Sequence, residues 1–199
     1  MILGIPFYKQ DKEVNCGPIS LQMVLNYFEG GFGLEEVEKA CEIKEGKGVF
    51  TVQLAFAAAS LGYKVEFYSK QIGVNKEHLK KEFYQRYAED LEKAEEFEKR
   101  AREFGAKVEE RHLGLSEILS YLDAGKVPIA LLDWNVVKGS REKGYRGHFV
   151  PVVGYDEENV YVHNGGFDSP QEFMSISKEV FDEARKVDGT GEDVVFVWK

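Results

Sequence analysis

A cysteine at the start of an apolar helix is the first feature of this chain that could do chemistry. The stretch YKQDKEVNCGPISLQMVLNYF, residues 8–28, puts Cys16 directly before Gly17 and Pro18. With Asn15 as N-cap, the thiol would lie near unpaired N–H groups and the positive end of the helix dipole, which favour the thiolate. We therefore expect Cys16 to be a nucleophile with a pKa below the free value of about 8.5. The alternative is a buried structural thiol.

A nucleophilic cysteine needs a base, and four histidines could supply it. His78 and His112 fall in or beside a segment rich in Lys and Glu, and they are most simply interpreted as surface residues. His148 opens an apolar strand directly after the polar loop KGYRG, a position from which a side chain can face a cleft. We therefore predict His148 as the base, and the alternative for it is a hydrogen-bonded core histidine.

The base in turn needs a partner that orients its ring. Asn164 ends the strand NVYVHN, and pairing of this strand across the turn DEEN with the strand that starts at His148 would bring the two residues together. Neighbouring side chains of a strand face opposite sides, so only one of Asn164 and His163 can be that partner. Asp156 is a rival carboxylate at the far turn. The simpler interpretation of Asn164 is a plain turn residue before Gly165.

Two further polar features bear on a substrate. Gln10 precedes the cysteine by six residues, and its amide could donate to the oxyanion of a tetrahedral intermediate together with the backbone N–H of Cys16. The alternative for Gln10 is a solvated loop residue. The loop 134–147 carries four cations that could attract an acidic substrate or simply be solvated. These cations are Lys138, Arg141, Lys143 and Arg146.

Apolar periodicities predict the elements that position these residues. Helices come first and strands follow, which predicts an α+β domain with N-terminal helices packed on a C-terminal antiparallel sheet. The expected helices are 16–29, 34–42, 52–61 after Thr51 as N-cap, 76–104, 115–125 and 177–186. The expected strands are 63–68, 127–133, 148–156, 159–164 and 193–198.

The segment 76–104 differs from the rest because it is rich in Lys and Glu and has one apolar stripe. Apolar residues at three- and four-residue steps predict one long helix, closed by Gly105. The simplest interpretation is a solvent-facing helix lying on the main body. A dimerisation arm, which would make the protein a homo-oligomer, and a cap over a substrate cleft are the alternatives. The stripe consists of Leu79, Phe83, Tyr87, Leu91, Ala94, Phe97, Ala101 and Phe104.

Length and composition limit the remaining possibilities. At 199 residues the chain fits a single domain, 1–199, with a helical insertion at about 75–112. The net charge of −9 argues against nucleic acid as a partner, and no apolar run approaches the ~20 residues of a membrane span. Two cysteines without CxxC or HExxH spacing predict neither a metal nor another cofactor. We expect a cytoplasmic protein with reduced thiols, and the Lys/Glu bias suits a thermophile.

Taken together, these residues resemble the C39-like cysteine peptidases of the papain-like fold. Three motifs carry the resemblance: QDKEVNCGP with Gln10 and Cys16, GHFVPVVGYD with His148, and VYVHN with Asn164. The likeness covers the two ends of the chain, and the long helix between them looks like an insertion. The resemblance implies a papain-like fold and site, in which Cys16 is the nucleophile and His148 the general base and acid.

The resemblance also assigns the two amide side chains. Gln10 would contribute to the oxyanion hole, and Asn164 would be the third residue of the triad. The family more often has an Asp followed by Pro at that position, where this chain has NGG. An asparagine still orients the ring but adds no charge to stabilise the imidazolium.

The sequence thus predicts a cysteine peptidase or related amide hydrolase that acts on a peptide or amide through an acyl-enzyme. A papain-like acyl or peptidyl transferase is the second hypothesis, and it shares the same nucleophile and base. A non-catalytic peptide-binding module that retains the fold is the third. The presence of all four candidate residues speaks against this third hypothesis, because binding alone gives no chemical reason for them.

Overall fold

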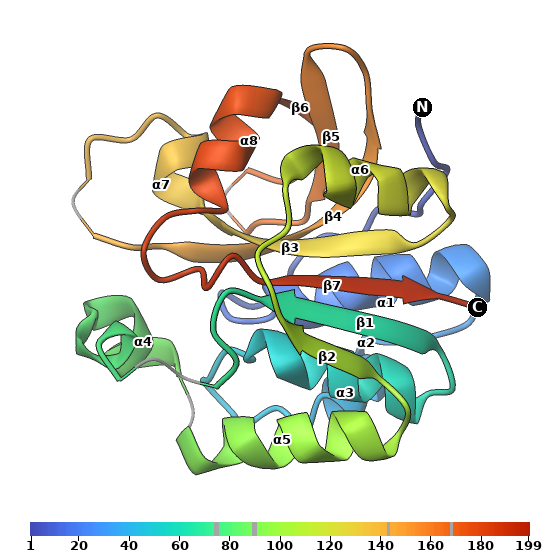
Figure 1. Cartoon of the computed structure of the whole chain (residues 1–199), viewed down its shortest axis with the longest axis vertical. Helices are drawn as coiled ribbons and strands as arrows, with labels where there is room; N and C mark the ends of the chain where they lie inside the picture. The colour runs from blue at the N-terminus through green and yellow to red at the C-terminus, as the bar shows by residue number, and fades with distance from the viewer. Residues whose placement is uncertain (74–75, 89–90, 143, 168) are drawn as a thin grey trace.

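A mixed seven-stranded sheet, covered by helices on both faces, forms the centre of the molecule (Figure 1). The computed structural model describes residues 1–73, 76–88, 91–142, 144–167 and 169–199, without the side chains of residues 91 and 92. The strand order is β2-β1-β7-β3-β4-β5-β6, and the predicted α+β class is confirmed. The strands are β1 Lys64–Ser69, β2 Lys107–Glu110, β3 Val127–Asp133, β4 Gly147–Tyr155, β5 Asn159–Asn164, β6 Gln171–Ser177 and β7 Val194–Trp198.

The helices divide between the two faces of the sheet (Figure 1). Helices α1 and α3 pack on one face, while α6, α7 and α8 lie on the other. The helices are α1 Cys16–Phe28, α2 Leu34–Ala40, α3 Thr51–Ser60, α4 Glu82–Tyr87, α5 Leu91–Glu103, α6 Leu115–Asp123, α7 Trp134–Val137 and α8 Lys178–Ala184, with a 3₁₀ turn η1 at His78–Lys80.

Strand β3 lies in the middle of the sheet and is covered by helices on both faces. All seven residues of VPIALLD are buried. Because side chains alternate along a strand, Ile129 and Leu131 belong to the core under α1 and α3, whereas Ala130 and Leu132 belong to the core under α6 and α8. A strand buried on both faces has a continuous apolar sequence rather than an alternating one.

Close packing of α1 against β4 places Cys16, at the start of the helix, beside the strand that carries His148. A Cβ at Gly17 would lie 2.5 Å from a Val49 methyl and 3.3 Å from the Phe149 ring. Only glycine therefore fits at this point without displacing a neighbour. Helix α1 is buried continuously from Gly17 to Leu25, so its N-terminus, with Cys16, is fixed relative to the sheet.

The prediction of one long helix over 76–104 is wrong. The backbone turns extended at Lys81 and at Ala88, which separates η1, α4 and α5. The apolar stripe serves two different neighbours: Phe97 of α5 packs against Phe56 of α3, with ring centroids 5.4 Å apart, whereas Phe83 of α4 packs against Tyr145, 5.1 Å away. One straight helix could not reach both, and Figure 1 shows α4 standing apart from α5.

The predicted sheet also needs correction. Strand β1, predicted at 63–68, belongs to the same sheet although it lies in the N-terminal half of the chain. Strand β2 was not predicted, and it pairs in parallel with β1. Strand β6, with the sequence QEFMSIS, was not predicted because it is mostly exposed and lacks apolar alternation. The loop 134–147 begins with the short helix α7, which was likewise not predicted.

The two predicted N-cap residues do not cap their helices with their side chains. Asn15 stands at the N-cap position of α1, and Thr51 starts α3, but neither side chain makes a capping hydrogen bond. The side chain of Gln53 instead accepts a hydrogen bond of 2.6 Å from the backbone N–H of Phe50. Asn15 donates to Asp11 Oδ1 at 2.6 Å. Other local hydrogen bonds therefore replace the caps that residue type alone suggests.

Candidate active site

The structure brings His148 and Asn164 together. Strands β4 and β5 pair antiparallel, as the sequence predicts, and His148 Nε2 lies 2.9 Å from Asn164 Oδ1. Two further bonds fix the amide: Oδ1 accepts from the backbone N–H of Gly166 at 2.8 Å, and Nδ2 donates to the carbonyl of Ser169 at 2.7 Å. Since Oδ1 can only accept, Nε2 carries the hydrogen and Nδ1 is left as the proton acceptor.

His163 faces away from this pair, which decides between the two candidate partners. Its side chain is fully buried, with Nε2 2.9 Å from the carbonyl of Ile5 and Nδ1 accepting from the backbone N–H of Phe173 at 3.1 Å. His163 is thus a hydrogen-bonded core residue. The third candidate partner, Asp156, caps the β4–β5 turn through the backbone N–H groups of Glu158 and Asn159.

Cys16 and His148 line the same cavity, which has a volume of about 890 Å³. Backbone N–H groups of Cys16, Gly17 and Phe149 favour the thiolate, but burial outweighs them and raises the pKa of the Cys16 thiol. The expectation of a lowered pKa is therefore wrong in this structure. A helix N-terminus contributes only a modest stabilisation of a charge, and removing a thiolate from water costs more.

Burial also keeps the histidine neutral. It lowers the pKa of His148 to about 4, with smaller lowering from the positive charges of Arg146 and Lys138, against the opposing effect of the bond to Asn164. Trp134 contributes to this burial, since its ring centroid lies 4.4 Å from that of His148. The resting site therefore holds a neutral thiol and a neutral imidazole.

Gln10 lies in the wall of the same cavity, but its amide points into its own loop. Nε2 donates to the carbonyl of Lys12 at 3.1 Å and to Asn15 Oδ1 at 3.4 Å, so both of its hydrogens are engaged. The backbone N–H of Gln10 donates to Gly165 at 2.8 Å, which ties this loop to the end of β5. A role for Gln10 as an oxyanion donor stays a prediction, because it requires one of these bonds to open.

Residues from the predicted 76–104 segment and from the entrance of β7 complete the cavity. Helix α4 contributes Phe83, Tyr84 and Tyr87 to its wall, so this part of the predicted helix covers the cavity while α5 lies on the main body. Asp193 lies at the other side, directly before the apolar strand β7. A charged residue at the entrance of the all-apolar strand VVFVW was the signal that could have identified it.

The cations of the 134–147 loop divide between the cavity and the surface. Lys138 and Arg146 line the cavity, Arg141 is exposed, and Lys143 lies outside the described residues. In the part of the chain that the structure describes, no group of three or more His, Cys, Asp or Glu side chains is arranged to hold a metal ion. Cys16 and Cys41 are both free thiols.

The lengths of the helices show whether any of them could span a membrane. Over the same described ranges, no helix combines the length and the apolar character that are needed to cross a bilayer.

The fold is that of C39 papain-like peptidase domains. A putative C39-like peptidase from Bacillus anthracis superimposes with a TM-score of 0.60 at 16% identity, covering 100% of this chain and 96% of the other. The peptidase domain of Streptococcus ComA, a bifunctional ABC transporter, gives 0.57 at 13% identity, with 97% of each chain covered. A double-glycine-motif protease of an AMS/PCAT transporter, solved with its leader peptide, gives 0.53 at 17% identity over 98% of this chain and 92% of the other.

Sequence comparison gives a different name. The family model described as guanylylate cyclase matches residues 5–197, and the chain belongs to this family. Guanylyl cyclase 1 of Arabidopsis thaliana is 27% identical over 209 residues, covering 98% of this chain and 76% of that protein. The predicted C39 resemblance thus describes the fold, while the sequence family carries the name of another activity.

Proposed function

We propose that the protein is a cysteine-dependent amide hydrolase that works through an acyl-enzyme. The observation that carries this proposal is the His148–Asn164 hydrogen bond of 2.9 Å, fixed in the wall of the cavity that Cys16 also lines. Because this hydrogen bond engages Nε2 of His148, Nδ1 is the ring atom that remains to accept the proton of the thiol.

The chemistry follows from these two groups. His148 Nδ1 takes the proton of the Cys16 thiol as sulfur attacks the substrate carbonyl carbon, and the imidazolium then gives this proton to the departing amine. The carbon–nitrogen bond breaks and a thioester with Cys16 remains. His148 next removes a proton from water, whose oxygen attacks the thioester carbonyl. The acid product leaves, and the proton returns to the cysteine sulfur.

Burial of the site fits this sequence of steps. A neutral thiol and imidazole are the less costly resting pair where both groups are partly removed from water, so proton transfer is expected to accompany substrate attack. The backbone N–H of Cys16 is a donor that the nucleophile itself supplies to the oxyanion. An amine in place of water would resolve the same thioester as a transfer reaction.

Guanylyl cyclase activity is the second candidate, because the family and the Arabidopsis relative carry that name. The cavity wall includes cationic side chains that could meet phosphate groups. Cyclisation of GTP joins the 3′ oxygen to the α-phosphate and releases pyrophosphate, which gives no role to a thiol. The cations are Lys81, Arg86, Lys138 and Arg146.

One experiment separates the two candidates. Wild-type protein, Cys16→Ser and the control Cys41→Ala are each given a peptide library with mass-spectrometric readout and, separately, GTP with Mg²⁺ or Mn²⁺ and a cyclic GMP assay. We expect amide cleavage that falls by at least about 10³-fold in Cys16→Ser and is kept in Cys41→Ala. Cyclic GMP formation that is equal in all three proteins, without Cys16-dependent cleavage, would overturn the proposal in favour of the cyclase.

A further inference from the structure

The cavity has a second polar end at the entrance of β7. Asp193 lines it together with the buried hydroxyl residues Ser69 and Thr51. No described residue forms an ion pair with the Asp193 carboxyl within 4.0 Å. The mechanism derived for Cys16 and His148 makes no use of this group.

Asp193 is a partly buried acid without a charged partner in the described part of the chain. Burial raises the pKa of its carboxyl to about 6, and the hydroxyls of Ser69 and Thr51 offset only part of the rise. The group is therefore mostly ionised at neutral pH. One neighbouring group of the cavity wall, the Tyr145 hydroxyl, is buried without a hydrogen-bond partner. Unpartnered polar atoms of this kind are costly in a fold that leaves them unused.

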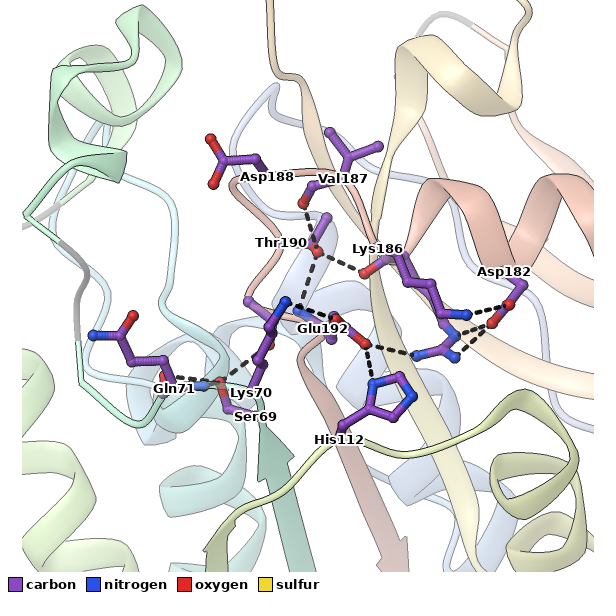
Figure 2. A network of polar contacts seen from close by, with 12 residues as sticks. Ser69, Lys70, Gln71, His112, Asp182, Lys186, Val187, Asp188, Thr190 and Glu192 are labelled. Atoms are coloured by element: carbon purple, nitrogen blue, oxygen red, sulfur yellow. Dashed lines mark hydrogen bonds and ion pairs between the residues drawn. The ribbon is translucent and has the colours of Figure 1, made fainter.

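The loop that delivers Asp193 is held by a dense polar network (Figure 2). Thr190 Oγ1 donates to the carbonyl of Arg185 at 2.6 Å and accepts from the backbone N–H of Glu192 at 3.1 Å. The side chain of Glu192 accepts in turn from His112 and from the buried Arg185. These bonds fix the backbone immediately before Asp193.

The backbone of this loop is also unusual. Glu192 has a positive φ of 56°, which costs a non-glycine residue on the order of 1 kcal/mol. A Cβ at Gly191 would lie 2.6 Å from Asp193 Oδ1, so glycine is needed there to leave room for the carboxyl. The loop therefore maintains a strained arrangement that directs this carboxyl into the cavity.

Sheet register gives the separation between the two ends. The backbone N–H of Leu131 donates to the carbonyl of Asp193 at 3.2 Å, and Leu131 pairs with Phe149 on the next strand. Cross-strand partners face the same side of a sheet, and two strand spacings are about 10 Å. The Cys16 sulfur lies against the backbone of Phe149. A lysine or arginine side chain, roughly 6 to 7 Å long from Cα to its terminal nitrogens, fits this separation.

From this geometry we propose that Asp193 determines specificity, by pairing with a cationic group of the substrate, an ammonium or a guanidinium, while the adjacent carbonyl lies at Cys16. The inference rests on the proposed hydrolase function and names its substrate class. The wall between the two ends is apolar and suits an aliphatic stem. It includes Phe67, Leu131 and Phe149.

The cations of the cavity do not neutralise this acid. Lys81 pairs with Asp188 and Arg86 with Glu13, at 2.7 and 4.0 Å. None of the described groups that shift the pKa of the Asp193 carboxyl is a cation. An incoming cation would therefore gain a charge-assisted hydrogen bond in a site of low dielectric.

A binding experiment tests the inference without relying on catalysis. Benzamidinium and its neutral analogue benzamide are titrated into wild-type protein, Asp193→Asn and the control Glu82→Gln, with calorimetric readout. Glu82 is an exposed carboxylate of the same cavity wall and tests for a general effect of negative charge. We expect wild type and Glu82→Gln to bind benzamidinium at least about tenfold more tightly than benzamide, and Asp193→Asn to lose this preference.

Three results would overturn the inference. These are equal binding of the two compounds to wild-type protein, a preference that persists in Asp193→Asn, and an equal loss in both variants. Guanosine is added as a further arm, since its N–H groups also suit a carboxylate; guanosine binding that depends on Asp193, without benzamidinium binding, reassigns this end to a nucleobase. Faster cleavage by the wild-type protein of peptides with lysine rather than norleucine at the cleaved bond would support the pairing of Asp193 with a cation. Failure of these binding tests would leave Cys16-dependent hydrolysis standing. Binding of benzamidinium through Asp193 is measured without catalysis, so the two failures can be told apart.

Discussion

The two ends of the cavity satisfy their polar groups in opposite ways. At the Cys16 end, the Asn164 amide orients His148 and is itself held by Gly166 and Ser169. At the Asp193 end, by contrast, a partly buried carboxyl has no cation partner among the described residues, and the nearby Tyr145 hydroxyl has no hydrogen-bond partner. Reacting groups must be oriented before the substrate arrives, whereas recognition groups can keep their bonding capacity for the ligand.

Electrostatics distinguishes the two ends as well. Burial lowers the pKa of His148 to about 4 and raises the pKa of Asp193 to about 6. Partial burial in the same cavity thus disfavours a positive charge on His148 and a negative charge on Asp193. The comparison teaches that a single cavity can favour neutral groups for chemistry and a bound cation for recognition.

The largest expected effect comes from removing the hydrogen bond that orients His148 at the Cys16 end of the cavity. Asn164→Ala removes the acceptor of His148 Nε2, so the ring can adopt the wrong tautomer or rotate, and we expect kcat/KM for the amide substrate to fall by about 10² to 10⁴. Asn164→Asp, the matched control, keeps an acceptor and adds a negative charge. It should retain most of the activity and move the acid limb of the pH–rate profile upward, because the charge raises the pKa of His148.

Steady-state kinetics across pH, together with thermal unfolding, measures this effect. Thermal unfolding is needed because Asn164→Ala also loses the bond to Ser169. Activity within about tenfold of wild type in a folded Asn164→Ala protein would contradict the triad.

Stability against pH sharpens the electrostatic comparison. Between its folded pKa of about 4 and its ordinary value of 6.5, His148 binds more protons in the unfolded chain, so the free energy of unfolding falls as pH falls through this window. Asp193, with a folded pKa of about 6 against an ordinary 3.8, binds more protons in the folded chain, so it opposes this trend and costs stability as pH rises. Each contribution amounts to at most about 3 kcal/mol.

Denaturant titrations between pH 4 and 7 measure both slopes. His148→Gln should flatten the loss of stability toward acid relative to wild type, because its side chain does not titrate. Asp193→Asn should steepen that loss and stabilise the protein at pH 7. Parallel pH curves for wild type and both variants would show that neither group is buried as the structure describes.

The smallest expected effect concerns the tyrosines over the far end. The Tyr84 hydroxyl donates to the carbonyl of Gly189 at 2.6 Å, whereas the Tyr145 hydroxyl has no partner, although the two rings stack with centroids 5.6 Å apart. Tyr84→Phe should therefore cost about 1 kcal/mol of unfolding free energy, and Tyr145→Phe should be neutral or slightly stabilising. Urea unfolding of the two variants measures the difference. A larger loss for Tyr145→Phe would mean that this hydroxyl is already satisfied.

Much of the fold follows from local pattern. The apolar run at 127–133, the apolar run after His148 and the turn between β4 and β5 were all visible in the sequence, because apolar runs and turn residues act over short distances. The pairing of β4 with β5 is enough to bring Asn164 back to His148. This part of the site could be predicted because it depends on a single hairpin.

The segment 76–104 shows where such reasoning ends. Its apolar stripe at helical spacing was real, but Phe97 packs on α3 and Phe83 on Tyr145, two partners from distant parts of the chain. Periodicity records that a side chain is buried, not what it is buried against. Two partners in different directions required a break that no local residue marks.

The sequence by itself therefore determined the class of the fold, the cysteine at the helix start and the hairpin that joins His148 to Asn164, since each depends on neighbours a few residues apart. Only the tertiary structure decided that Cys16 and His148 are neutral, and that Asp193 lies across the sheet from Phe149. Desolvation and strand order arise from contacts between distant segments, so these properties exist only once the whole chain has folded.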